Sequence, residues 1–492
     1  MKIAFTKRGG DQGSIILVSL VVAAVAGITL ASYLILAETQ TVSVYRSQSW
    51  NSSLPVTEAG IEDALQLINR YAGSMEPEDI PKWTNHVTES NWETLGSGVY
   101  HVKRHLPFST AQGNWFTNSY DVWITNAASP IIYATATVPW THYYASAAPQ
   151  SVFASIGLPL LANMTTTEPV PAAAQELRRN VDVKTMYDPL FNVAMAALET
   201  IDLKGNNITT DSFDSADPNF SDNGKYPSHV NKTRANGSVC TSASLIDSID
   251  MGNANIKGRV KTGPGVDTIE IGPNGSVGDR AWVESGTDGI KPGWAATDFN
   301  AIFNTVEPPG VTPLPKAAVP QVVDGTTYQY VFSSDGWYYP AAGISGNVLF
   351  NAPTNHIIRL IVYTPVSLSG QTVIRVANTG VKVRIYMAGN QFSLTGQACI
   401  DNQSGAADRF YLYGLKTCKS ITFSGNASFC GGIYAPQAAF TLGGGGADVY
   451  DFVGASVTRT VTMNGKFRFH YDENLRRLGP GRGYIPVSWK EM

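Results

Sequence analysis

The longest uncharged stretch of the chain lies close to its N-terminus. No residue from Gln12 to Ala37 is charged, and the apolar part covers residues 14–37. As an α-helix this part would measure about 36 Å, against roughly 30 Å for the core of a bilayer. Lys7 and Arg8 precede it, so the positive-inside rule places the N-terminus in the cytoplasm. We therefore expect a membrane anchor helix over residues 1–38.

A cleaved signal sequence is the alternative for this segment. Ala24-Val25-Ala26 would supply a cleavage site of small residues. The apolar core of a signal sequence has about 7–15 residues, however, and the stretch found here is longer. We therefore favour an uncleaved span.

Helical spacing continues beyond the apolar stretch. Apolar residues such as Ile61 and Leu65 recur at intervals of three and four, with charged residues on the other faces. This pattern predicts an amphipathic stalk helix within residues 39–73. Pro55 suits the first turn of such a helix and Gly73 suits its end, so we expect a break or kink near Pro55.

The next zone, residues 74–150, contains three segments in which apolar and polar residues alternate. They cover residues 98–105, 119–126 and 131–139. Alternation with a period of two is typical of β-strands, so we expect a small antiparallel β region. Residues 151–184, where Ala, Pro and Thr are frequent, are expected to form a linker.

A short repeat appears beyond residue 185. Its form is apolar, any, apolar, any, Gly, as in ITFSGN (421–426) and VTMNGK (461–466). The last five copies place their glycines at irregular intervals, at Gly370, Gly396, Gly425, Gly444 and Gly465. Because each copy supplies one short strand and one glycine turn, the repeat predicts a parallel, right-handed β-helix with loops of unequal length. An antiparallel sandwich or barrel is the alternative.

The β-helix is expected in two parts, residues 185–305 and 346–475. A proline-rich crossover over residues 306–345 separates them, because proline interrupts regular strands, and a tail follows over 476–492. The expected fold class is therefore mainly β: an N-terminal transmembrane and amphipathic helix, a small antiparallel β region, and then a parallel β-helix.

The chain carries little charge. Asp, Glu, Lys and Arg make up 15% of its residues, against about 25% in an average soluble protein, and the net charge is −4. A nucleic acid is not an expected partner, because no basic field is present. Low charge with 46 glycines favours a β-rich protein outside the cytoplasm.

The N-terminal part resembles the same part of PilX-type pilus-assembly proteins, which are type IV pilin-like. The resemblance covers about residues 8–70 and depends on a basic leader, Gly13-Ser14, the apolar helix and EAGIEDAL (58–65). Major pilins have a Glu five residues after the cleavage point, where this chain has Ile15 or Val18. The resemblance therefore implies a small pilin-like domain over residues 74–150 and a minor rather than a bulk subunit.

A second resemblance covers about residues 195–475. SIDMGNANIKGRVKTGPG (248–265), SITFSGNASFCGGIYAPQAAFTLGG (420–444) and FRFHYDENL (467–475) are similar to an uncharacterised β-helical domain that often follows PilX-like N-termini. That domain distantly resembles the polymer-forming bactofilins. The resemblance implies no catalytic residue and no cofactor.

Two groups of polar residues are candidates for chemistry. Asp211, Asp214, Asp217 and Asp222 form the densest acidic group, but their spacing does not fit a calcium-binding EF-hand loop, so we expect turns and no metal site. His470 and Asp472 are two apart on an expected strand and would share a face, which makes an acid–base pair conceivable. We favour a capping role for this segment.

The chain has four cysteines, Cys240, Cys399, Cys418 and Cys430, without a Cys-x-x-Cys pair. A structural zinc site is therefore not expected, whereas disulfides are permitted outside the cytoplasm. The disulfide candidates are Cys399, Cys418 and Cys430. Cys399–Cys418 is the favoured pair because the separation of the two along the chain approaches one coil length, and Cys418–Cys430 is the alternative.

These features favour a non-catalytic, membrane-anchored, pilin-like protein of the cell envelope, with a structural or adhesive role. It would cross the bacterial inner membrane once and carry a periplasmic or cell-surface body. Its expected partners are the membrane, through residues 14–37, and pilin-like or secretion-system subunits. A β-helical enzyme that degrades polysaccharides and a self-assembling, bactofilin-like scaffold are the alternatives.

Overall fold

The computed structural model describes residues 12–70, 83–85, 87–109, 115–139, 176–205, 208–245, 248–265, 269–308, 310–444 and 450–492. The chain divides into two compact units. Unit 1 comprises Met1–Tyr71, Pro81–Tyr187 and Tyr484–Met492, and unit 2 comprises Ala72–Ile80 and Asp188–Gly483. Along the chain, most of unit 2 is thus an insertion between the last two segments of unit 1.

Unit 1 begins with a single 57-residue helix, α1 (Gln12–Ile68). The expectation of a second helix starting at Pro55 is wrong, because Pro55 lies inside α1. A proline in a helix interior costs about 3 kcal/mol, since it cannot donate to the carbonyl four residues earlier. The turns around it are held by side chains: the Ser53 hydroxyl donates to Trp50 O at 2.6 Å and the Thr57 hydroxyl to Ser53 O at 2.9 Å. Burial of the residues that follow, including Ile61 and Leu67, offsets the loss.

The sheet of unit 1 has the order β1-β2-β3-β4-β5-β33. Its described pairings are antiparallel, and the three strands expected within residues 74–150 are confirmed as β2, β3 and β4. The strands are β1 (Glu93–Gly96), β2 (Val99–Ser109), β3 (Trp115–Thr125), β4 (Ile131–Pro139), β5 (Glu176–Pro189) and β33 (Gly481–Glu491).

Two segments of unit 1 differ from expectation. The expected linker, which was to end at residue 184, contains the beginning of β5, and the expected tail contains β33. β5 forms because Val181, Val183 and Thr185 alternate with more exposed residues and become buried. Residues 151–175, the rest of the expected linker, lie outside the described residues.

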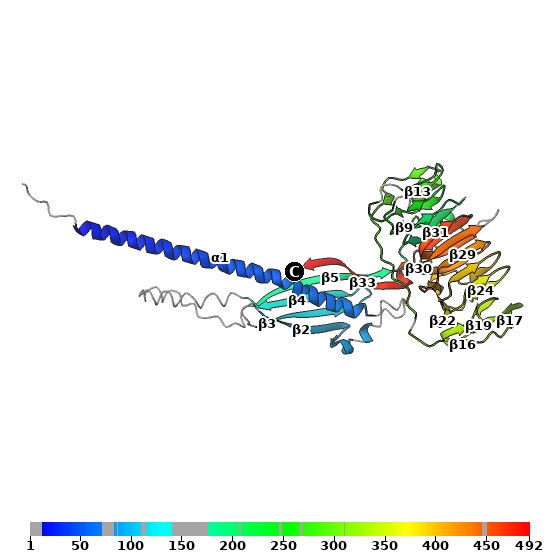
Figure 1. Ribbon diagram of the computed structural model, residues 1–492, viewed down its shortest axis with the longest axis horizontal. Helices are drawn as coiled ribbons and strands as arrows, with labels where there is room; N and C mark the ends of the chain where they lie inside the picture. Colours follow the sequence, from blue (N-terminus) through cyan, green and yellow to red (C-terminus); the bar gives the residue numbers. More distant parts are fainter. Residues whose placement is uncertain are drawn as a thin grey trace, which may run out of the picture. The chain divides into compact units, whose positions relative to one another are not determined.

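One face of this sheet packs against the C-terminal part of α1, as Figure 1 shows for β3 and β4. A Cβ on Gly60 would lie 2.8 Å from Val122 Cγ2, so glycine permits the close approach of helix and sheet. Beside it, Asp63 accepts from Arg104 Nε at 2.5 Å and from the Tyr120 hydroxyl at 3.1 Å. Burial, with the Asp63 carboxylate, raises the pKa of Tyr120 to about 12. Gly60 and Asp63 both belong to EAGIEDAL.

Unit 2 is built from short strands that stack in parallel in three columns. The chain contributes a strand to one column, then to the others, and then comes back to the first, so that each turn of the chain adds one strand to a column. The first column contains β20 (Gly336–Pro340), β22 (Ile357–Val362), β25 (Lys382–Met387), β28 (Phe410–Gly414), β30 (Phe429–Gly444) and β31 (Tyr450–Met463). The second contains β23 (Val366–Leu368), β26 (Gln391–Leu394) and β29 (Ser420–Gly425), followed by the later halves of β30 and β31. The third contains β19 (Tyr330–Phe332), β21 (Val348–Phe350), β24 (Val373–Val376) and β27 (Cys399–Asn402).

The earlier half of unit 2 stacks on the end of the later half. β6 (Met195–Ala197) and β7 (Ile201–Asp202) pair with β31, and β8 (Thr209–Phe213) pairs with β32 (Phe467–Asp472), all in parallel. Figure 1 shows this junction where the green strand β9 lies near the orange-red strand β31. The stack continues through β9 (Val239–Thr241), β10 (Ile249–Asp250), β11 (Asn255–Lys257), β12 (Val260–Lys261), β13 (Ser276–Gly278), β14 (Gly289–Ile290) and β15 (Ala295–Ala296).

The glycine repeat found in the sequence marks one corner of the stack. A Cβ on Gly396 would meet Gly370, one on Gly425 would meet Gly396, and one on Gly444 would meet Gly425. Gly465 in turn lies against Gly444, and Gly205 of the earlier half lies against Gly465. The repeat glycines therefore form one column, because neighbouring backbones approach too closely there for a side chain.

The expected crossover over residues 306–345 is largely folded. It contains β16 (Leu314–Lys316), β17 (Gln321–Val323), β18 (Thr326–Tyr328), β19 and β20. Pro315 is tolerated because β16 has its described pairing on one side only, with β20, so its missing N–H breaks no ladder. A strap before β16 connects the two halves: Phe303 and Val306 are buried, and Asn304 O accepts from the Tyr434 hydroxyl at 2.8 Å.

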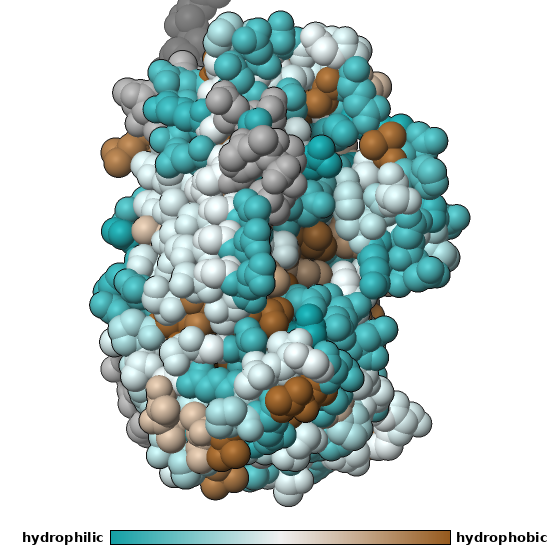
Figure 2. All heavy atoms as spheres, turned by 90° about the vertical axis from the view of Figure 1, so that its right-hand side faces the viewer, coloured by the Kyte–Doolittle hydropathy of each residue, from teal (hydrophilic) through white to brown (hydrophobic). Residues whose placement is uncertain are grey.

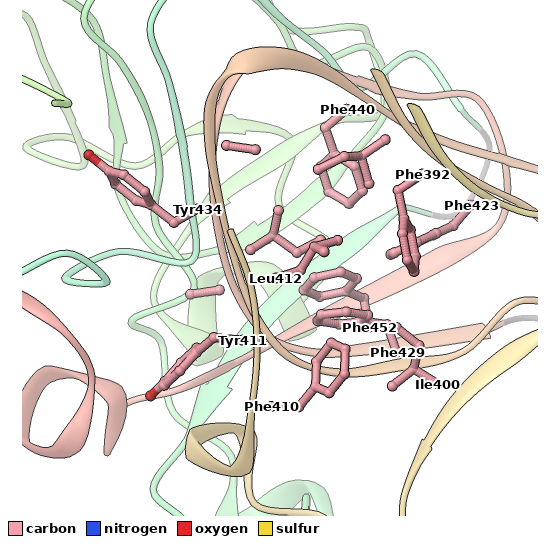
Figure 3. Packing of buried hydrophobic residues seen from close by; sticks show 14 of the residues in the cluster. Phe392, Ile400, Phe410, Tyr411, Leu412, Phe423, Phe429, Tyr434, Phe440 and Phe452 are labelled. Atoms are coloured by element: carbon pink, nitrogen blue, oxygen red, sulfur yellow. The ribbon is translucent and has the colours of Figure 1, made fainter. Parts of the chain in front are cut away.

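The core of unit 2 is a stack of aromatic rings inside the columns. Figure 3 shows Phe410, Phe423, Phe429 and Phe452 gathered on one side of the strands, with Tyr411 and Tyr434 on the other. Ring centroids lie 4.6 Å apart for Phe429–Phe452 and 4.3 Å apart for Phe452–Phe469. Consecutive strands in parallel register place these rings above one another, so the repeat of apolar positions becomes a continuous core.

Short helices complete the described structure. They are α4 (Arg280–Glu284), α5 (Leu475–Leu478) and 3-10 turns at residues 83–85, Thr88–Ser90, Val230–Lys232 and Ala407–Arg409.

Candidate functional site

The N-terminal part of α1 is the most exposed apolar surface in the described chain. Ile15, Leu20 and Ile28 expose 69%, 67% and 68% of their surfaces. By length and composition the helix from Ile15 onward can cross a membrane, and its most apolar window has no buried residue. Apolar side chains on all sides of a helix are typical of a span or of a helix covered by partners.

The acidic residues 211–222 do not converge. Asp214 accepts from Arg477 at 2.5 Å, Asp222 accepts from Lys232 at 2.6 Å, and Asp217 closes a turn with Asn219. The pKa of Asp222 is held well below its usual range by the hydrogen bond from Lys232. Among the described residues, no group of three or more His, Cys, Asp or Glu side chains is arranged so that it could hold a metal ion.

Asp211 instead takes part in a buried cluster around His470. β8 and β32 pair so that Asp211 lies beside His470, and Asp211 Oδ1 is 2.6 Å from His470 Nδ1. The other ring nitrogen of His470 lies 3.3 Å from Asp451 Oδ1. The Tyr226 hydroxyl donates to Asp211 at 2.8 Å, and its ring stacks on the imidazole with centroids 3.6 Å apart. We call Asp211, His470, Asp451 and Tyr226 the His470 cluster.

The His470 cluster favours a charged imidazole. Burial disfavours the cation, but the hydrogen bonds with Asp211 and Asp451 outweigh it, and the pKa of His470 is raised. For Asp451, burial is outweighed by the same bond, and its pKa is lowered. Burial beside Asp211 raises the pKa of the Tyr226 hydroxyl. Because carboxylates occupy both ring nitrogens, the arrangement suits an ion pair that holds β8 to β32, and it leaves no ring nitrogen for a substrate proton.

Asp472 does not pair with His470, so the structure does not bring the two expected partners together. Asp472 Oδ1 accepts from the backbone of Ser215 and of Asn474, each at 3.1 Å, whereas Oδ2 is buried without a hydrogen-bond partner among the described residues. Burial raises the pKa of Asp472 to about 6. The neighbouring Glu473 accepts from Ser212 at 2.8 Å and Asn236 at 2.7 Å. These contacts attach the loop after β8 to the end of β32.

Sequence reasoning missed Tyr226 and Asp451. Asp451 was overlooked because no motif links it to His470, which lies on the following strand. Only the register of β31 with β32 brings them together, since Val453 of β31 lies beside His470. Tyr226 lies in a loop without regular structure. Such a loop has no periodic pattern of apolar residues, so the sequence does not predict where its side chains lie.

No disulfide joins the four cysteines in the structure. Burial raises the pKa of Cys240 to about 12 and that of Cys418 to about 11, and it also raises the pKa of Cys399 and Cys430. Ile400, the residue after Cys399, donates its N–H to Ser428 O. The segment stacked next to Cys399 is therefore the one around Ser428, and Cys418 comes earlier along the chain than a full coil length. This register weakens the premise of the Cys399–Cys418 disulfide, which stays a prediction together with Cys418–Cys430.

Residues 312–478 match a protein family described as a domain of unknown function (DUF7305). The match covers the later half of unit 2 from β16 to α5. It ends before β33 and does not include the strands β6 to β15 that complete the stack. Among curated proteins, no match was found.

A comparison with solved structures finds the competence-associated pilin ComZ from Thermus thermophilus. The identity is 9%, and the alignment covers 90% of this chain and 98% of that chain, with a TM-score of 0.22. At this TM-score the two folds cannot be equated, so no function follows from the similarity.

Proposed function

We propose that this protein is a non-catalytic, pilin-like component of the cell envelope that is anchored in the membrane by the N-terminal part of α1. The observation that carries the proposal is the division of α1. Its first part is apolar and exposed, and its last part packs on a small antiparallel sheet through Gly60 and Asp63. A helix of this kind can anchor a folded head in a membrane or pack against equivalent helices in an assembly.

Unit 2 would be the body that the anchor presents outside the cytoplasm. We infer that it is a right-handed parallel β-helix, and its parallel columns and stacked glycines support this. Figure 2 shows apolar residues scattered in separate spots over one face of this body, among hydrophilic and neutral ones. Such a surface suits water, so membrane contact would fall to α1.

The expected partners are pilin-like or secretion-system subunits, as in PilX-type proteins. Ile15 and Val18 stand where major pilins have a glutamate that is thought to pair with a neighbour's N-terminus. Incorporation without that charge pair would depend on apolar packing along residues 14–37. This supports a minor subunit, located in the inner membrane before assembly.

One observation bears on the bactofilin-like alternative. A scaffold of that kind grows when the strands at the end of one copy pair with those of the next copy. Here the strand at one end of the stack is β16, and it contains Pro315. A proline at a free strand edge disfavours the addition of another strand. A membrane-attached monomeric body is therefore the better proposal than a filament formed by stacked coils.

The experiment replaces Val22 and Ile28, which are 61% and 68% exposed, with lysine in the same chain. Each lysine costs about 2.5–3.5 kcal/mol at the centre of a span, so the Val22→Lys, Ile28→Lys chain should leave the membrane fraction upon carbonate extraction. The matched control is Val44→Lys, because Val44 is also exposed on α1, at 55%, but lies beyond the apolar stretch. Full membrane retention of the double variant, or cytosolic recovery of the intact wild-type chain, would contradict the proposal.

A further inference from the structure

The hairpin β17–β18 and the outer face of the third column enclose an open groove of about 620 Å³ in unit 2. Gly325, Thr326 and Thr327 of the hairpin form one wall. The floor contains Val373 and Arg375 of β24 and Cys399 and Asp401 of β27. These four side chains point outward, because Ile374 and Ile400, their neighbours along each strand, are buried in the core.

Arg375 is fixed at the centre of the floor. Its Nε donates to Asp401 Oδ2 at 2.7 Å, and its Nη1 donates to the Tyr328 hydroxyl at 2.7 Å. Arg375 and Asp401 are direct partners in the register of β24 and β27. Tyr328 is 1% exposed and belongs to a small outer cluster with Leu349 and Val373. The donor is therefore preorganised by packing, as a binding site requires.

Several polar groups of the groove have no partner among the described residues. They include the second carboxylate oxygen of Asp401, the remaining N–H groups of Arg375 and the hydroxyl of the exposed Thr327. Donors and acceptors thus lie side by side on the two neighbouring strands. Val373 and Cys399, also direct register partners, provide a less polar strip along the same floor.

We propose that this groove binds a neutral oligosaccharide through the vicinal hydroxyls of a sugar ring. Each vicinal hydroxyl can both donate and accept a hydrogen bond. The guanidinium of Arg375 would donate to one hydroxyl, and the neighbouring carboxylate of Asp401 would accept from the other. The C–H face of the ring would lie on Cys399, because Val373 is only 8% exposed and packs with Tyr328 and Leu349. Arg375 is already paired with Asp401, so its charge is compensated, and an acidic sugar is not the expected ligand. The groove does not require the membrane anchor, so this proposal and the proposed function can fail separately.

The test uses the full chain in a detergent without a sugar headgroup, under reducing conditions. Maltohexaose, cellohexaose and chitohexaose are the neutral probes, and a hexamer of galacturonate is the acidic one. Each hexamer is added at about 10 mM, because a shallow polar site binds sugars weakly. At this concentration at least one neutral hexamer should slow alkylation of the Cys399 thiol severalfold. Cys430 is the internal control, because it does not line the groove.

The matching variant is Arg375→Met, which keeps the length of the side chain and removes its donors. It should weaken binding of the protective hexamer about tenfold, since hydrogen bonds from a charged group are lost. Arg280→Met is the control, because Arg280 forms an ion pair with Glu284 on α4, outside the groove. The proposal is overturned if no neutral hexamer protects Cys399, if only the galacturonate hexamer does, or if folded Arg375→Met binds as tightly as the wild-type chain. The protection assay on the wild-type chain decides the matter even if that variant fails to fold.

Discussion

At the scale of the residue, His470 and Asp472 are two apart on β32, and their charges have opposite effects on the stability of the fold. His470 is 2% exposed and lies between two carboxylates, whereas Asp472 is fully buried and keeps one oxygen without a partner among the described residues. His470 thus stabilises the junction of β32 with β8 through charge, and the charge of Asp472 destabilises it. Two predictions follow from this contrast.

Replacing His470 with Ala should destabilise unit 2 by about 3–5 kcal/mol, because it leaves the buried carboxylate of Asp211 with the Tyr226 hydroxyl but without its cationic partner. Chemical denaturation of the full chain, followed by tyrosine and tryptophan fluorescence, measures the change. The control is Lys204→Ala, which removes the ion pair of the exposed Lys204 with Asp250 and should alter stability far less, because an ion pair at the surface is screened by solvent. Equal effects of the two substitutions would show that the His470 cluster is not an ion pair of consequence.

Asp472 predicts a loss of stability as pH rises. Its folded pKa of about 6 exceeds the value near 3.9 of an unfolded chain, so the folded state binds more protons between those values. Ionisation then disfavours the fold by about 3 kcal/mol between pH 4 and pH 6. The raised pKa of His470 acts in the same direction above pH 6.5, since its favourable charge is lost as pH rises through the folded value.

Asp472→Asn should remove the part of this decline between pH 4 and pH 6. It should also make the protein more stable than the wild type at pH 7.5. Denaturation midpoints at pH 4, 6 and 7.5 for both chains measure it. Parallel pH profiles for variant and wild type would contradict the assignment.

At the scale of the element, α1 combines two environments in one helix. Gly60 lies against Val122 of β3, whereas a Cβ on Gly27 would have no atom within 4 Å. Gly60→Ala should destabilise unit 1 by about 1–3 kcal/mol through overpacking, reduced by the gain of about 1 kcal/mol that Gly→Ala brings to a helix. Gly27→Ala, the matched control in the same helix, should not loosen the packing. Faster amide hydrogen exchange across residues 56–68 only in Gly60→Ala is the expected result, and unchanged exchange would refute it.

Disulfide pairing is also a property of elements, because it depends on which strand ends are neighbours. Cys399 lies on β27, and Cys418 lies in the turn between β28 and β29, where its thiol is 3.9 Å from Ser420 O. Non-reducing peptide mapping of protein taken from the envelope decides whether Cys399–Cys418 or Cys418–Cys430 forms. A Cys399–Cys418 bond would require local movement of these strand ends and should slow unfolding of the later half. Free alkylation of all four thiols would remove the prediction.

At the scale of the whole molecule, unit 2 has neighbouring ends. Arg482 forms a two-point ion pair with Asp188, at 2.7 and 2.9 Å, and the N–H of Leu190 donates to Pro480 O at 2.8 Å. A domain inserted into another usually has its ends close together. The boundaries of the folding unit should therefore be residues 188 and 483 and not those of the matched family.

A fragment of residues 188–483 should thus fold as a cooperative monomer. A fragment of residues 312–478 lacks β6, β7 and β8, and it would leave edges of β31 and β32 unpaired. It should aggregate or melt at a lower temperature. Size-exclusion chromatography and thermal melts of both fragments test this, and a monomeric 312–478 with the melting temperature of 188–483 would contradict the role of the junction.

Much of the local structure could be predicted from the sequence. The uncharged run at residues 14–37 predicted a helix, the alternation at residues 119–126 and 131–139 predicted strands, and the repeat glycines predicted a corner. Each of these features depends on neighbours along the chain, because helices and strands have fixed periods. Pro55 was misjudged because the burial that keeps α1 intact comes from the sheet.

The tertiary structure alone decided the order of stacking and the chemistry at the junction. The repeat copy IDLKGN (201–206) indicates that β7 belongs to the stack. The sequence does not indicate that β6, β7 and β8 lie against β31 and β32, since backbone pairing carries no information about which strand becomes the neighbour. The same holds for the His470 cluster, whose members come from four segments, and for the groove beneath the β17–β18 hairpin. Sequence periodicity determines which side chains face inward, whereas the contacts between distant segments are set by which edges and apolar faces remain uncovered once the local elements have formed.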